Sequence, residues 1–333
     1  MEFNSERLRT YDGSNLVFPK LAQYVKEHLY PHQRDVIWRI IQSKNTLLAH
    51  CVGAGKTWEM QVSAMEMKRL GLIKKPLFVV PPNILKQFER EFYVAYPSAK
   101  LLILTAADLS TPKINISFDE KVDTSGRKKT AESAVKMDNK ESATQRQGRL
   151  LARRQSLSKI VAGDWDGIII SHYMFMRLPM SPETYNEFYR EQKALLTAEK
   201  QTLYGTKAGD KRHKKLLENA LSALEQRLAR DINEEKKEIV IPFEELGIDQ
   251  IFVDEADMFK NLGFNTHYNS SIGEYVSGIN TSNAQRSLDM YIKTRWLTKL
   301  RNGGGVFFAT GTPISNALNE IYTMQRYLDY QTL

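Results

Sequence analysis

The sequence predicts an α/β fold in which helices cover a mainly parallel β-sheet. Short apolar runs without strict alternation recur along the chain, and this pattern is typical of strands buried on both faces. Helical stretches lie between several of these runs, as expected when helices connect parallel strands. A Gly-rich segment also follows the first run and opens a helix, which favours the same fold class.

The predicted strands are rich in Val, Ile and Phe. They span residues 46–49, 77–80, 101–104, 167–170, 250–253 and 306–309. Helices are predicted over residues 57–69, 83–94 and 283–300. The first ends at Gly71 and the last before a run of three glycines, and glycine commonly follows the last turn of a helix.

The order of elements indicates one domain over residues 1–333 with two insertions. Residues 113–150 are polar and basic, so we expect a loosely ordered insertion there. Residues 182–237 contain two helical halves around a Gly-rich centre, which predicts a helical hairpin. The second half carries leucines at spacings of four, three and four, as in a coiled-coil seam: Leu217, Leu221, Leu224 and Leu228.

The positive charge of the chain is local. The chain of 333 residues has 47 Lys and Arg against 39 Asp and Glu, a net charge of +8. Residues 121–159 hold 11 basic and four acidic residues, and residues 200–215 hold six and one, so the remainder is net acidic. Such segments suit a phosphate-binding surface, and a solvated basic linker is the alternative.

Composition excludes several classes of protein. No apolar run approaches the roughly 18–20 residues that a membrane helix needs, and the first residues are too polar for a secretory signal. The single cysteine, Cys51, excludes an internal disulfide framework and a multi-cysteine zinc site. We therefore expect a cytoplasmic protein that does not enter a membrane.

The strongest chemical signal is a phosphate loop, defined here as residues 50–57. Gly53, Ala54 and Gly55 let the backbone wrap a phosphate, and Lys56 and Thr57 open the following helix. Lys56 is expected to neutralise the β- and γ-phosphates of ATP, and the Thr57 hydroxyl to bind Mg²⁺. His50 stands where the strict motif has its first glycine, and we expect Cys51 to be partly buried beneath the loop.

Two further polar turns follow predicted strands. Residues 254–257, the acid box, read Asp-Glu-Ala-Asp. Asp254 is expected to hold Mg²⁺ through water, and Glu255 to orient or deprotonate the attacking water. Residues 310–312, the threonine turn, place Thr310, Gly311 and Thr312 where they can reach the γ-phosphate or a neighbouring loop.

These segments together resemble the first ATPase lobe of superfamily 2 helicases, nearest to Swi/Snf-type DNA translocases. Six motifs occur in the order of that family: residues 31–33, 50–57, 79–85, 169–173, 254–257 and 310–316. Residues 163–166, 175–182 and 259–262 look more narrowly like the helicase–DNA methyltransferase fusion proteins of phages, plasmids and conjugative elements. Asp257 departs from those relatives, in which the acid box usually ends in His.

The resemblance implies a RecA-like lobe that binds ATP and Mg²⁺. It implies that Gln33 recognises adenine and that Thr310, Gly311 and Thr312 couple hydrolysis to movement. It also implies a second lobe, normally in the same longer chain, which we expect to be absent from these 333 residues. Such a lobe supplies arginine to the transition state.

The resemblance and the basic insertion together suggest contacts with DNA, with duplex favoured. The candidate residues are Asn83, Lys86, Ser171, His172, Lys128 and Lys129. For His172 a structural hydrogen bond is the alternative to a DNA contact. Two other functions remain open: a module that binds nucleotide and nucleic acid without turnover, and an RNA helicase lobe, as the D-E-A-D letters allow. The T-G-T-P turn fits the DNA translocases better.

Overall fold

The fold is built on one six-stranded parallel sheet. The computed structural model describes residues 11–105, 108, 143–202, 222, 241–262, 285–315 and 319–330. The strands are β1 (Asn45–Leu48), β2 (Pro76–Val80), β3 (Leu101–Leu104), β4 (Gly167–Ser171), β5 (Gln250–Val253) and β6 (Val306–Ala309). Their order is β1-β6-β5-β2-β4-β3, and every neighbouring pair is parallel. All six predicted strands and the predicted fold class are confirmed.

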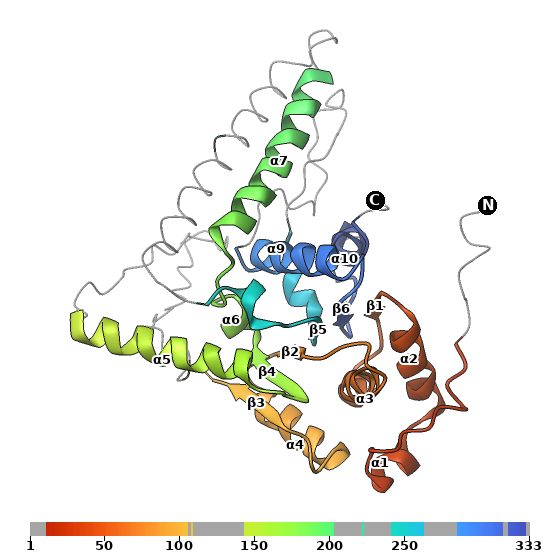
Figure 1. Ribbon diagram of the computed structural model, residues 1–333. Coiled ribbons are helices and arrows are strands. Elements are labelled where there is room, and N and C mark those ends of the chain that lie inside the picture. Colours follow the sequence, from red (N-terminus) through yellow and green to blue (C-terminus); the bar gives the residue numbers. More distant parts are fainter. Residues whose placement is uncertain are drawn as a thin grey trace, which may run out of the picture.

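Helices cover both faces of the sheet (Figure 1). One face packs against α1 (Gln23–His28), α2 (Pro31–Gln42), α3 (Lys56–Arg69) and α4 (Leu85–Ala95). The other face packs against α5 (Ala143–Ala162), α6 (His172–Phe175), α7 (Pro182–Thr202), α9 (Gln285–Leu300) and α10 (Asn319–Leu328). Short 3₁₀ helices η3 (Phe243–Leu246) and η4 (Ala256–Phe259) flank β5.

Alternating side chains divide the apolar residues between the two cores. In β2, Leu77 and Val79 face one core while Phe78 and Val80 face the other. Phe78 stacks on Phe252 of β5 at 5.2 Å between ring centroids, and Phe252 stacks on Phe307 of β6 at the same distance. This row of rings joins the three central strands and buries large apolar areas, which fixes their register.

The two predicted insertions lie partly outside the described residues. Residues 143–150, expected to be loosely ordered, are the first two turns of α5, a helix without acidic residues. Helix α7 corresponds to the first half of the predicted hairpin. The leucine seam of its second half lies outside the described residues, as do Lys128 and Lys129. Among the described helices, the search for membrane spans finds none of sufficient length and apolar character.

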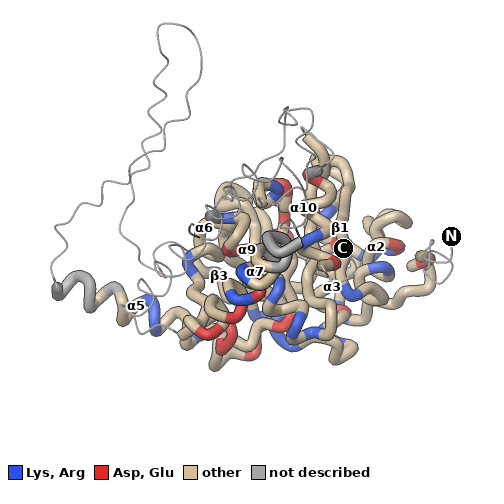
Figure 2. The backbone as a smooth tube through the Cα atoms, turned by 90° about the horizontal axis from the view of Figure 1, so that it is seen from above, with Lys and Arg blue, Asp and Glu red and all other residues tan. Residues whose placement is uncertain are grey.

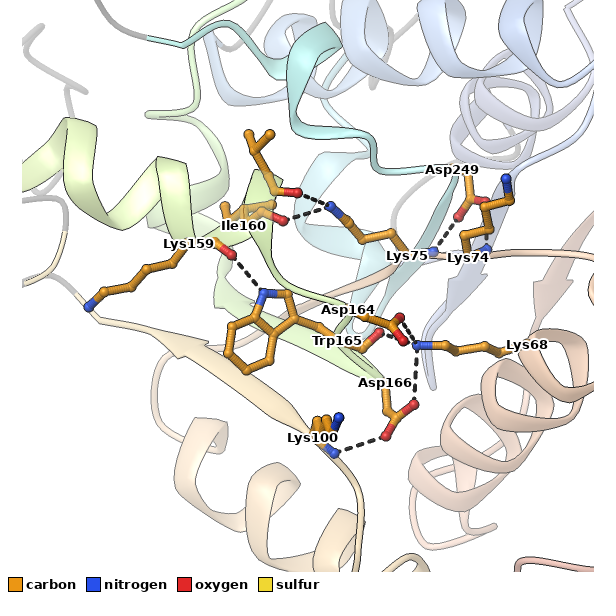
Figure 3. A network of polar contacts seen from close by, with 11 residues as sticks. Lys68, Lys74, Lys75, Lys100, Lys159, Ile160, Asp164, Trp165, Asp166 and Asp249 are labelled. Atoms are coloured by element: carbon orange, nitrogen blue, oxygen red, sulfur yellow. Dashed lines mark hydrogen bonds and ion pairs between the residues drawn. The ribbon is translucent and has the colours of Figure 1, made fainter.

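A polar network ties the segments that precede the strands, at the amino edge of the sheet (Figure 3). The Lys68 ammonium, near the end of α3, donates to Asp164 Oδ1 at 2.8 Å and to the Trp165 carbonyl at 2.7 Å. It also pairs with Asp166 Oδ1 at 3.2 Å, and Asp166 Oδ2 accepts from the Lys100 N–H at 2.9 Å. One lysine thus joins α3 to the starts of β3 and β4.

A second lysine closes the end of α5. The Lys75 ammonium donates to the carbonyls of Ile160, Val161 and Leu246 at 2.7, 3.0 and 3.3 Å. The last carbonyls of a helix receive no hydrogen bond from an N–H of the same helix. A cation placed there therefore stabilises the helix end. Asp249 accepts from the Lys75 N–H at 2.9 Å and brings β5 into the same network (Figure 3).

We expect Lys68→Met to lower the free energy of unfolding by about 1–3 kcal/mol, because Asp166 and the Trp165 carbonyl lose a charged donor. Urea unfolding followed by circular dichroism measures this change. Lys74→Met is the control, since Lys74 is exposed and contacts Asp249 through its backbone N–H. Equal midpoints for the two variants would contradict a stabilising role for Lys68.

Candidate active site

Three polar turns meet at the carboxyl edge of the sheet because their strands are neighbours. The phosphate loop follows β1, the threonine turn follows β6 and the acid box follows β5, in that spatial order. Leu48 pairs with Ala309, and Val253 pairs with Phe308, so the turns begin at nearly the same level. This edge is where parallel sheets place their ligand sites.

The phosphate loop has the backbone that its glycines predict. Gly53 and Gly55 have φ values of 87° and 86°, a region that other residues rarely adopt. The Lys56 side chain is buried, and its ammonium donates to the carbonyls of His50 and Cys51 at 3.2 and 3.3 Å. No acidic side chain of the described residues forms an ion pair with Lys56. Its charge is therefore available to an anion at the start of α3, where the first N–H groups also lack helical acceptors.

Gln33 is buried against this loop. Its Oε1 accepts from the Tyr30 N–H at 2.9 Å, and its Nε2 donates to the carbonyls of Ala54 and Gly55 at 3.3 and 3.4 Å. The side chain therefore fixes the loop relative to α2. Contact between Gln33 and adenine stays a prediction.

The two loop glycines make a matched pair for a test. We expect Gly55→Ala to weaken binding of Mg-ADP by about tenfold or more, because the new Cβ would lie 2.0 Å from Gln33 Nε2. Gly53→Ala imposes a similar backbone strain but meets nothing within 4 Å, so its loss should be smaller. Calorimetric titration with Mg-ADP compares them, and equal losses would show that Gln33 is not a constraint on the loop.

The acid box presents one buried and one partly buried carboxyl group. Asp254 Oδ1 accepts from the Glu255 N–H at 3.0 Å. Burial, followed by the neighbouring charge of Glu255, raises the Asp254 pKa to about 6, and the Lys56 ammonium opposes this rise. Glu255 adopts a left-handed conformation, with φ 48° and ψ 53°, which is uncommon for a residue with a side chain. The turn thus holds two adjacent carboxyl groups, of which Asp254 interacts electrostatically with Lys56.

A divalent cation fits these donors. Asp254 is buried beside a second carboxylate, a situation that a Mg²⁺ ion or its bound water would relieve. Thr57 lies in the first turn of α3 and can supply the hydroxyl. Within the described residues no group of three or more His, Cys, Asp or Glu forms a dedicated metal site. Asp254 and Thr57 are the residues that would hold such an ion.

The threonine turn links the other two turns. The buried Thr310 hydroxyl donates to Asp257 Oδ1 at 3.3 Å and accepts from the Thr312 N–H at 3.1 Å. A Cβ on Gly311 would lie 3.0 Å from Val52 of the phosphate loop. These contacts suit the coupling role expected of Thr310, Gly311 and Thr312, which stays a prediction.

Of the four described residues that were predicted to contact nucleic acid, two are exposed and two are buried. Asn83 and Lys86 are exposed near the start of α4. Ser171 and His172 are buried: Ser171 Oγ accepts from the Met174 N–H, and His172 Nε2–H donates to the Asp254 carbonyl at 2.7 Å. The expectation that these two side chains contact DNA is corrected, because both are occupied inside the protein. For His172 the structural alternative is the one observed.

Sequence reasoning missed two contacts at this edge. His50 Nδ1 lies 3.1 Å from Glu59 Oε1, and Asp257 meets Thr310. Glu59 is fully buried, and burial raises its pKa to about 8. Burial, then the charges of His32 and Lys56, lower the His50 pKa. A carboxylate within an apolar helical stretch was the available signal for Glu59.

Cys51 is exposed, which corrects the expectation of partial burial. Its carbonyl accepts from Lys56 while its side chain faces outward, because the loop leaves the sheet at Ala49, which is itself exposed. We expect labelling of Cys51 by a thiol reagent to slow when Mg-ATP orders the loop. Intact mass spectrometry measures the rate, with Lys56→Ala as the control that should not respond to nucleotide. Fast labelling of the wild-type chain at saturating Mg-ATP would place Cys51 away from the ligand.

Comparisons with known proteins include a matching family model, one distant relative and a similar solved structure. A family model described as a probable helicase domain matches residues 38–126 and 127–333. The chain is 20% identical over 325 residues to "Defense against restriction protein B" of Escherichia phage P1, which covers 97% of this chain and 14% of that protein. It is similar, with a TM-score of 0.41 and 13% identity, to the "Sulfolobus solfataricus SWI2/SNF2 ATPase core in complex with dsDNA", over 92% of this chain and 36% of that one. The chain therefore spans well under half of the length of either protein.

Proposed function

This chain belongs to the family of probable helicase domains, and from that premise we propose that it is the ATP-binding lobe of a DNA-dependent ATPase. The proposed reaction is hydrolysis of Mg-ATP, coupled to translocation on duplex DNA or to strand separation. The observation that carries the proposal is the convergence of Lys56 with the carboxyl groups of Asp254 and Glu255 at one edge of the sheet.

Each residue at this edge has a proposed task. Lys56 and the first N–H groups of α3 bind the phosphates of ATP, and Thr57 and Asp254 hold Mg²⁺, the latter through water. When bound, Mg²⁺ neutralises charge that develops on the phosphates. Glu255 accepts a proton from the attacking water or orients it, because its partly buried side chain follows Asp254 at the carboxyl edge of the sheet.

A second helicase lobe is a proposed partner, normally encoded in the same longer chain. Stabilisation of the transition state by arginine is worth about 10³–10⁵ in rate in related phosphoryl transfer. In the family that the sequence resembles, the second lobe supplies this arginine. We therefore propose that this chain alone hydrolyses ATP slowly.

DNA is the proposed polymer, and the sequence is the main support for it. In Figure 2, Lys and Arg alternate with Asp and Glu over the body of the lobe. The excess of basic residues lies instead in residues 121–159 and 200–215. Five of these basic residues belong to α5: Arg146, Arg149, Arg153, Arg154 and Lys159. Lys128 and Lys129 belong to the first of these segments. A local excess of basic charge suits sequence-independent contact with phosphates. We also propose a cytoplasmic setting, in a bacterium or a phage-infected host.

The test is ATP turnover by the chain, alone and together with the proposed second lobe, with duplex DNA, single-stranded DNA or RNA added. Stimulation mainly by duplex DNA, weakening steeply with salt, is the expected result. Stimulation by RNA alone would favour the RNA helicase alternative. Binding of Mg-ATP without turnover under any condition would favour the other alternative, a module that binds nucleotide and nucleic acid but does not hydrolyse ATP.

A further inference from the structure

Position 50 carries a histidine where the strict phosphate-binding motif has a glycine. Among the described residues, positive φ values occur only at Glu255, Asn302 and six glycines, so His50 has an ordinary backbone conformation. The chain can therefore carry a side chain at this position without backbone strain. If the loop binds phosphate, the imidazole of His50 must lie outside the space that the phosphate occupies.

The imidazole is held between α2 and α3. Nδ1 of His50 lies 3.1 Å from Glu59 Oε1 on α3. The ring also meets His32 of α2 edge-on, at 5.9 Å between centroids, and His32 Nε2 lies 3.2 Å from the Ala54 carbonyl of the same loop. The backbone carbonyl of His50 in turn accepts from the Lys56 ammonium at 3.2 Å. His50 therefore contacts Glu59 through its side chain and Lys56 through its backbone carbonyl.

Glu59 is a polar side chain in a buried position, where it lowers the stability of the fold. It is fully buried, one turn beyond Lys56 on α3, and its Oε2 has no hydrogen-bond partner among the described residues. Burial of a carboxyl group with one free oxygen destabilises the fold. An apolar residue at this position would pack without that penalty. We therefore expect the carboxyl group to have a role other than stabilising the fold. Among the described residues, the side-chain hydrogen bond that it makes is the one to His50.

We propose that Glu59 is a positioning residue, which holds the His50 imidazole against α2 and α3 and so keeps the phosphate loop in the form that binds nucleotide. This inference rests on the proposed function, because it assumes that the loop binds phosphate. Release of the imidazole would free it to turn into the loop and would move the carbonyl that holds Lys56. Removal of the imidazole would in turn make the carboxyl group dispensable.

The test is a double-mutant cycle on the 333-residue chain, with the dissociation constant for Mg-ADP measured by calorimetry. Glu59→Leu is expected to weaken binding by about tenfold, because the imidazole loses its side-chain partner on α3 and the loop is no longer held in its binding form. Glu59→Gln, whose side-chain amide can either accept from or donate to His50 Nδ1, should lose much less. The double variant H50G/E59L should bind as H50G alone does, and more tightly than E59L. Circular dichroism confirms that each variant is folded, and E59A replaces E59L in the cycle if E59L does not fold.

Two results would overturn the inference. One is an E59L variant that binds Mg-ADP as the wild type does. The other is a double variant as weak as E59L, because Glu59 would then act through the packing of α3 and not through His50.

A measurement without nucleotide separates this inference from the proposed function. The ring signals of His50 in a proton–carbon NMR spectrum, assigned with H50G among the six histidines, should shift in E59L. If the wild-type chain does not bind Mg-ADP, the proposed function fails while the NMR shift still reports whether Glu59 holds the ring. An unchanged His50 signal in E59L would refute the positioning role whatever the nucleotide result.

Discussion

Lys56→Ala is expected to abolish measurable binding of Mg-ATP, with a loss of roughly a hundredfold or more. The Lys56 ammonium is buried, and its described contacts are two backbone carbonyls and no carboxylate. A phosphate that replaces those carbonyls gains a full charge in a poorly solvated site, and alanine removes that charge. Calorimetric titration of the chain with Mg-ATP measures the change.

Lys74→Ala is the matched control for Lys56→Ala. Lys74 is exposed and precedes β2, so it lies at the amino edge of the sheet, opposite the phosphate loop. Its removal changes the net charge of the chain equally and should leave the affinity for Mg-ATP unchanged. Unchanged affinity in Lys56→Ala itself would contradict the assignment of residues 50–57 as the phosphate loop.

Glu255→Gln is expected to retain binding of Mg-ATP and to slow hydrolysis by about 10²–10⁴, the range for loss of a general base. Glutamine keeps the shape of the side chain and the strained backbone at φ 48°, but it accepts a proton poorly. Asp254 and Thr57 remain to hold Mg²⁺, so binding should persist. Single-turnover hydrolysis, with the chain in excess over ATP, measures the chemical step without requiring rapid product release.

The control for Glu255→Gln is Glu245→Gln, since Glu245 is an exposed acid on η3 and has no part in the acid box. Both variants should bind Mg-ATP, and only Glu255→Gln should lose hydrolysis. Equal hydrolysis by the two variants would remove Glu255 from the reaction and would shift the role of base to another group.

The six strands were predictable because their signal is local. Runs such as residues 167–170 are apolar at every position, and the structure buries both faces of β4 between helices. Gly53 and Gly55 were predictable for a related reason, since a left-handed backbone strongly selects glycine at the position itself. The helical start of residues 143–150 was missed because the surrounding polar composition resembles that of a loop.

Tertiary structure alone decided which turns became neighbours. The sequence places β5 and β6 about two hundred residues or more after β1, and no local pattern states that β6 inserts between β1 and β5. Strand order depends on which faces and edges the helices cover, and therefore on the packing of the whole domain. That order brings Thr310 between the phosphate loop and Asp257.

For individual side chains, too, the sequence determined some properties and the tertiary structure determined others. The sequence by itself determined the types of group at the site, namely a lysine and hydroxyl after a Gly-rich turn and two acids after a strand, because these are fixed by position along the chain. Only the tertiary structure decided that His172 is buried against the Asp254 carbonyl and that His50 meets Glu59. A hydrogen bond between residues on different elements depends on distance and burial in space, and neither is encoded in the spacing of the letters.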